Sequence, residues 1–186
     1  MKAVGLVTEY NPFHNGHIYH IQQAKAVTGA DVVIAVMSGN FVQRGEPALF
    51  DKWTRTQAAL ANGVDLVIEL PTFYAVQPSH LFAEGAIKLL TALGVEDVVF
   101  GSEHATVDFL NLAKQAPSVQ GGKAFQEKNQ TFAQAYATQL ESETGFKLED
   151  PNDILAFGYA KAILNLNSPI KLHAIQRVAA GDRKSV

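Results

Sequence analysis

Short apolar runs recur along the chain at intervals of about thirty residues and alternate with longer amphipathic segments. Such continuous runs, rich in β-branched residues, are typical of parallel strands that are covered on both faces. Strands are predicted over Ala3–Val7, Asp31–Met37, Val64–Leu70 and Asp97–Gly101. Helices are predicted between them over Gly16–Val27, Lys52–Ala61, Ser79–Leu93 and Thr106–Lys114. This alternation predicts a doubly wound, Rossmann-like α/β fold with a parallel sheet.

The segment from 115 to 148 is less regular, and we interpret it as a helical insertion with a helix near Thr131–Glu143. A helix is predicted to start near Pro151-Asn152-Asp153, with Asn152 or Asp153 close to its cap. A fifth strand is predicted at Ile170–Ala174. Residues 1–186 are therefore expected to form one nucleotide-binding domain that carries this insertion.

Size and composition fit an ordinary globular domain, since the 186 residues are 47% hydrophobic and 18% charged. The chain has no cysteine, which excludes disulfides and thiolate metal sites and suits the cytoplasm. No apolar run approaches the length of a membrane span, and the N-terminus enters a strand too quickly for a signal peptide. The formal net charge is −3, so this domain alone is not expected to hold DNA or RNA tightly.

The residues that follow the strands are small, polar or glycine. In doubly wound sheets ligands bind beyond the carboxyl ends of the strands, so these residues are candidates for one site. They are Thr8 to Pro12 after the first strand, Ser38 to Phe41 with Gln43 to Gly45 after the second, Pro71 to Tyr74 after the third, and Gly101 to Glu103 after the fourth. Turn chemistry explains any one of them, but four such ends at one edge favour a binding site.

The most specific pattern is Asn-Pro-Phe-His-Asn-Gly-His at positions 11 to 17. A helix that begins here offers unpaired backbone N–H groups and the positive end of its dipole to an anion. His14 and His17, three residues apart, can both donate to the same group of phosphate oxygens. The alternatives are a helix cap, a solvated histidine or a zinc site that includes His20. The helical rotation separates His14 from His20 and disfavours zinc, so no metal site is assigned.

These residues carry a resemblance to a known family. The segment from 11 to 17 is the HxGH signature of the nucleotidylyltransferase superfamily. The wider pattern resembles the bacterial tRNA(Met) cytidine acetate ligase family through four further segments: Val36 to Phe41 with Gln43 to Pro47, Asp65 to Pro71, Phe100 to Glu103, and Pro151 to Asp153. The resemblance covers nearly the whole chain.

The resemblance implies an enzyme that uses ATP, with Mg²⁺, to convert acetate to acetyl-adenylate. The acetyl group would then pass to the exocyclic amine of the wobble cytidine of elongator tRNA(Met). It also implies catalytic roles for His14 and His17. The implied ATP-binding residues are Val7, Thr8, Glu9, Tyr10, Asn11, Pro12, Phe13, His14, Asn15, Gly16, His17, His20, Gly101, Asn152 and Arg177.

Weaker substrate candidates are Ser38, Asn40 and Arg44, which follow the second strand where acetate or phosphate could be held. The alternative for Arg44 is a pair with Glu46 or contact with solvent. Members of the family are about twice this length, and the late ISSTxxR-type motif of the superfamily is absent here. The chain therefore resembles an N-terminal portion. The alternative functions are a nucleotide-binding module without independent turnover and a small-molecule nucleotidylyltransferase.

Overall fold

A five-stranded, wholly parallel sheet forms the centre of the computed structural model, which describes residues 1–116 and 140–177. The strands are β1 (Ala3–Thr8), β2 (Val32–Ser38), β3 (Leu66–Leu70), β4 (Asp97–Ser102) and β5 (Lys171–Gln176). Their spatial order is β3-β2-β1-β4-β5, with β1 paired to both β2 and β4. This order confirms the predicted doubly wound α/β fold.

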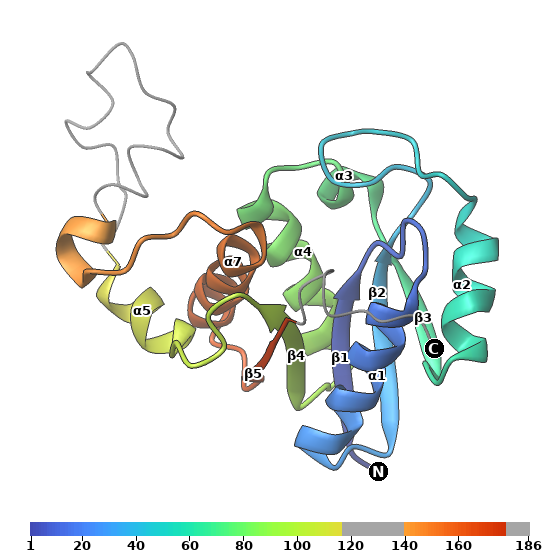
Figure 1. Cartoon of the computed structure of the whole chain (residues 1–186), viewed down its shortest axis with the longest axis horizontal. Helices are drawn as coiled ribbons and strands as arrows, with labels where there is room; N and C mark the ends of the chain where they lie inside the picture. Colours follow the sequence, from blue (N-terminus) through green and yellow to red (C-terminus); the bar gives the residue numbers. More distant parts are fainter. Residues whose placement is uncertain (117–139, 178–186) are drawn as a thin grey trace.

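Helices cover both faces of the sheet (Figure 1). They are α1 (Asn15–Thr28), α2 (Lys52–Ala61), α3 (Thr72–Ala75), α4 (Ser79–Ala92), α5 (Phe109–Gln115) and α7 (Pro151–Leu166). Successive strand residues point to opposite faces, so Val33 and Ala35 pack with α1 and α2, whereas Ile34 and Val36 pack with α4 and α7. Two hydrophobic layers therefore hold the strand ends in register.

The ends of the predicted elements agree with the structure to within two residues, except at two places. The short helix α3 was not predicted, and α5 begins at Phe109, after an Asp108 cap, rather than at residue 106. Helix α7 begins with Pro151 after its Asp150 cap, so Asn152 and Asp153 lie in its first turn, close to the cap as predicted. Most of the predicted helix at 131–143 lies outside the described residues, although residues 140–144 are helical.

The strand order predicts where a ligand binds, at the carboxyl ends of β1 and β4. The chain leaves β1 toward β2 on one side, and β4 pairs with β1 on the other side. The crevice between neighbouring strands whose connections run in opposite directions is the usual ligand site of such sheets. Within the described residues, no helix has the length and apolar character needed to cross a membrane.

Candidate functional site

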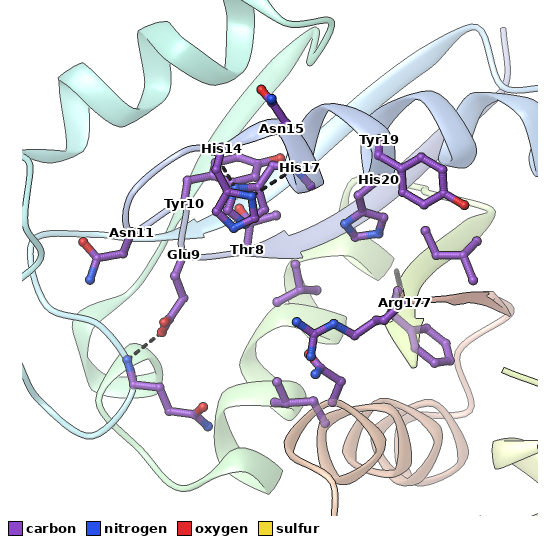
Figure 2. A pocket seen from close by; sticks show the side chains of 18 of the residues that line it. Thr8, Glu9, Tyr10, Asn11, His14, Asn15, His17, Tyr19, His20 and Arg177 are labelled. Carbon is purple, nitrogen blue, oxygen red and sulfur yellow. Dashed lines mark hydrogen bonds between the residues drawn. The ribbon is translucent and has the colours of Figure 1, made fainter. Parts of the chain in front are cut away.

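A cavity of about 560 Å³ lies at the carboxyl ends of β1, β4 and β5. Its walls come from the β1–α1 loop, the first turns of α1, and residues of α4, α7 and the end of β5. Figure 2 shows the rings of His14 and His17 on the α1 side and the side chain of Arg177 reaching in from the end of β5. The volume lies in the range of small-molecule binding sites.

The cavity gathers most of the residues that the sequence analysis assigned to a nucleotide. The lining includes Val7, Thr8, Glu9, Tyr10, Asn11, Pro12, His14, Asn15, Gly16, His17, His20, Gly101, Asn152 and Arg177. Phe13 is absent from the lining, because its ring packs against Tyr10 and His17. The weaker candidates Ser38, Asn40 and Arg44 are also absent, while Gln43, beside Arg44, is present. The roles of all these residues stay predictions.

The two histidines of the motif form the cap of α1. The backbone N–H of Gly16 donates to Nδ1 of His14 at 3.0 Å, and the backbone N–H of His14 donates to Nδ1 of His17 at 3.2 Å. The two rings stack with their centroids 3.7 Å apart. One nitrogen of each ring caps α1, and each ring has a second nitrogen that can contact a ligand. The two histidines can therefore act both as a helix cap and as an anion-binding pair.

These cap bonds fix the orientation of each imidazole. A ring nitrogen that accepts a hydrogen bond carries no hydrogen, so the hydrogen of each neutral ring is on Nε2. Both histidines thus present Nε2–H as a donor. The buried ring of Tyr10 lies edge-on to His17, with centroids 4.9 Å apart, and limits the movement of that ring.

His20 differs from His14 and His17. Its Nε2 lies 3.0 Å from the carbonyl oxygen of Val99 on β4, which makes Nε2 the donor. Burial lowers the pKa of His20, because the charged imidazolium is desolvated there. The ring therefore ties α1 to β4 and remains neutral, and its Nε2 is not directed at an ion shared with His14 and His17.

Glu9 brings a carboxylate to the cavity at the end of β1. Its Oε1 accepts the backbone N–H of Gln43 at 2.6 Å, and Nε2 of Gln43 donates to Oγ of Ser79 at the start of α4. Burial raises the pKa of Glu9 above its ordinary value, and the hydrogen bond from Gln43 opposes that rise. The β2–α2 loop is thereby joined to the cavity rim.

The sequence analysis missed Arg55 of α2, whose side chain is buried beneath this rim. Its guanidinium donates to the carbonyl oxygens of Glu9 at 2.6 Å and Ser38 at 3.1 Å, and also to those of Phe50 and Gly39. These acceptors lie at the ends of β1 and β2 and just before α2. One side chain therefore holds three segments together. Arg55 and Ala59 share the buried face of α2, but an arginine at such a position is not marked by an apolar pattern in the sequence.

A second network supports the α7 side of the cavity. Asp153, which is 1% exposed, accepts hydrogen bonds from Oγ of Ser102 at 2.6 Å and the backbone N–H of Glu103 at 3.1 Å. Its other oxygen lies 2.6 Å from Nδ1 of His104, and this contact raises the pKa of His104. Together with Asp150 these groups have metal-ligand chemistry, with ligand atoms within 4.8 Å of one another. The hydrogen bonds that join Asp153 to Ser102, Glu103 and His104 make this cluster a structural network.

Comparisons with known proteins place this geometry in context. A model of the HIGH nucleotidyl transferase family matches residues 1–185. A Leuconostoc mesenteroides protein named tRNA(Met) cytidine acetate ligase is 73% identical over 180 residues, which cover 97% of this chain and 46% of that protein. The Oenococcus oeni protein of the same name is 58% identical, with coverage of 97% and 48%. The chain thus spans about half the length of the curated relatives it matches.

Solved structures give the same picture. The structure of Thermotoga maritima TmcAL bound with alpha-thio ATP is 43% identical and superposes with a TM-score of 0.84 over 96% of this chain and 47% of that one. The apo form of the same protein gives a TM-score of 0.87 over 100% and 48% of the two chains. The fold is therefore shared with the T. maritima protein, whose structure has been solved with an ATP analogue.

Proposed function

The chain belongs to the HIGH nucleotidyl transferase family, and on that premise we propose that it carries the ATP-binding and acetate-activating site of a tRNA(Met) cytidine acetate ligase. The observation that carries the proposal is the cavity in which the capping histidines of α1 meet Gly101, Asn152 and Arg177. The names of the similar proteins and the ATP-analogue complex of the T. maritima protein support it.

The proposed first step joins acetate to ATP. A carboxylate oxygen of acetate attacks the α-phosphorus, the bond from that phosphorus to the bridging oxygen breaks, and pyrophosphate leaves with the electron pair. His14 and His17 donate their Nε2–H groups to phosphate oxygens on which negative charge increases. The N-terminus of α1 adds backbone N–H groups to the same region. Alignment and charge stabilisation, rather than a protein nucleophile, drive this step.

In the proposed second step the exocyclic amine of the wobble cytidine of elongator tRNA(Met) attacks the carbonyl carbon of acetyl-adenylate. The carbon–oxygen bond to AMP breaks, AMP leaves, and the amine loses one proton to become an amide. The formal net charge of −3 indicates that this chain alone is a weak partner for the tRNA backbone. We therefore assign the activation step to this chain and assign most of the tRNA contacts to other parts of the full-length relatives. We propose the cytoplasm as the location of the reaction, because its proposed substrate is a tRNA.

Mg²⁺ is proposed to accompany ATP. This ion is usually held by phosphate oxygens and water, with one or two carboxylates. The cavity fits that requirement, because Glu9 contributes a carboxylate to its lining. Bound there, Mg²⁺ would neutralise charge on the triphosphate. The roles of Ser38, Asn40 and Arg44 toward acetate stay proposals, and the cavity lining favours Gln43 over them.

Acetate-dependent exchange of labelled pyrophosphate into ATP tests the activation step directly. We expect exchange with acetate and little with propionate or pantetheine phosphate. ATP binding without exchange would instead support a nucleotide-binding module without independent turnover, which the half-length match to the relatives makes the second candidate. Exchange driven by a phosphorylated small molecule would support a small-molecule nucleotidylyltransferase. Addition of elongator tRNA(Met) with labelled acetate then tests acetyl transfer.

A further inference from the structure

Glu103, the first residue after β4, connects two side chains of the cavity wall. Its Oε1 accepts a hydrogen bond from Nδ2 of Asn152 at 2.6 Å and another from the guanidinium of Arg177 at 2.7 Å. Asn152 belongs to α7, and Arg177 directly follows β5. Asn152 and Arg177 both line the cavity, whereas Glu103 is not part of the lining. One carboxylate oxygen outside the cavity lining therefore holds two side chains, Asn152 and Arg177, that can contact a ligand.

The backbone of Glu103 is itself held in place. Its N–H donates to the buried carboxylate of Asp153 at 3.1 Å, and its carbonyl oxygen accepts from Nε2 of Gln176 at 3.0 Å. Gln176 is another residue of the cavity wall. The backbone of Glu103 is therefore fixed by neighbouring elements, and its carboxylate is held by the two donors Asn152 and Arg177.

The path of the Arg177 side chain is also restricted. A Cβ on Gly101 would lie 3.1 Å from Cγ of Arg177, so the aliphatic part of the arginine passes close to the backbone of β4. The side chain of Arg177 is 49% exposed and that of Glu103 is 25% exposed. A half-exposed arginine with four rotatable bonds samples many rotamers unless a partner holds it.

The geometry points to Glu103 as a positioning residue of the nucleotide site, which holds Asn152 and Arg177 ready for the nucleotide without touching it. The inference rests on the proposed function only in that ATP is the ligand of this cavity. The carboxylate removes rotamer freedom before binding, so the ordering of two side chains no longer opposes nucleotide binding. It also gives both donors a charge-assisted acceptor, which is stronger than a neutral one.

ATP affinity of the purified chain, measured by titration calorimetry, tests the inference. We expect Glu103→Ala to bind ATP about tenfold more weakly, since a hydrogen bond to a charged group contributes about a factor of ten or more. Glu103→Gln keeps one acceptor oxygen in the same shape and should lie between wild type and Glu103→Ala. Glu84→Gln is the matched control, because Glu84 pairs with Lys88 on α4 and does not line the cavity.

A triple variant, compared with the Asn152→Ala/Arg177→Ala double variant, separates positioning from a general structural role. If Glu103 acts through Asn152 and Arg177, its removal should cause no further loss of affinity in a chain that already carries Asn152→Ala and Arg177→Ala. An equal loss in both backgrounds would overturn the inference, as would a Glu103→Ala affinity equal to or higher than wild type. Should Glu103→Ala fail to fold, Glu103→Gln in the same two backgrounds decides.

The two proposals fail in different ways. A wild-type chain that binds ATP but shows no acetate-dependent exchange refutes the proposed activation step and leaves the positioning comparison intact. A wild-type chain that binds no ATP refutes both proposals. Wild-type exchange together with unchanged ATP affinity in Glu103→Ala refutes only the positioning role.

Discussion

Substitutions of His17 can separate its two roles, which are capping α1 and, as proposed, donating a hydrogen bond to phosphate. Nδ1 accepts the backbone N–H of His14 at the start of α1, and Nε2 carries the hydrogen that we propose is donated to phosphate. His17→Ala removes both atoms. His17→Asn keeps a polar atom near the position of Nδ1 but cannot reach the position of Nε2, and His17→Gln does the reverse.

The structure sets the expected magnitudes. Loss of a cap acceptor costs about 1 kcal/mol, and loss of the ring contacts with Tyr10 and Phe13 costs about 1 kcal/mol more. His17→Ala should therefore lower the melting temperature by roughly 4–8 °C, at about 2–4 °C per kcal/mol for a domain of this size. Loss of one preorganised donor should slow pyrophosphate exchange by roughly 10²-fold or more.

Thermal unfolding and acetate-dependent exchange, both measured on the same preparations, check this expectation. His17→Asn should recover part of the stability and none of the exchange, whereas His17→Gln should recover part of the exchange and little of the stability. Wild-type exchange rates in His17→Asn would refute the donor role of Nε2. A His17→Ala rate that falls only in proportion to the unfolded fraction would refute it as well.

Three further predictions concern the scaffold. Arg55→Met should lower the free energy of unfolding by at least about 3 kcal/mol in denaturant titrations, because four carbonyl groups lose their donor and those of Ser38 and Gly39 are buried; a change below about 1 kcal/mol would contradict the role of Arg55. Gly85→Ala should destabilise by about 1–3 kcal/mol in the same assay, because its Cβ would collide with the ring of Tyr74; the stabilisation usual for a helical Gly→Ala change would contradict the packing. Burial alone would raise the pKa of Asp97, but hydrogen bonds from Lys2 and His173 outweigh it and hold that pKa below 3.8. The contribution of Asp97 to stability is thus complete above about pH 5 and is lost as the pH falls through the lowered value. Asp97→Asn should be less stable at neutral pH and show a flatter acid dependence, and an unchanged acid dependence would contradict the assignment.

Local patterns predicted most of the sheet but only part of the cavity wall. The end of β1 and Gly101 line the cavity, whereas Ser38 to Phe41 after β2 and Pro71 to Tyr74 after β3 do not. The apolar runs predict strands because a parallel strand is buried on both faces and therefore has apolar residues throughout. The carboxyl ends of parallel strands then lie at one edge of the sheet. The sequence alone therefore predicts that the segment from 7 to 17 lies beside Gly101. The family resemblance added Asn152 and Arg177, which no local pattern connects with the first histidine.

The rest depends on contacts between residues far apart in the chain. Arg55 meets the carbonyl oxygen of Glu9 across 46 positions, and Glu103 meets Arg177 across 74. No periodicity marks such pairs, because each partner is ordinary for its own element. Helix α3 was missed for a different reason, since four residues are too few to show a helical repeat. The sequence thus predicted the residues that line the cavity better than the residues, such as Arg55 and Glu103, that hold the lining in position.

The central place of β1 has a consequence for how the chain folds during synthesis. β1 is made first, yet its two edges stay unpaired until β2 and β4 have followed, and β5 with Gln176 and Arg177 comes later still. The cavity therefore has no complete wall in any shorter nascent chain. A nucleotide that binds this cavity can slow unfolding of the finished sheet but cannot guide its early assembly.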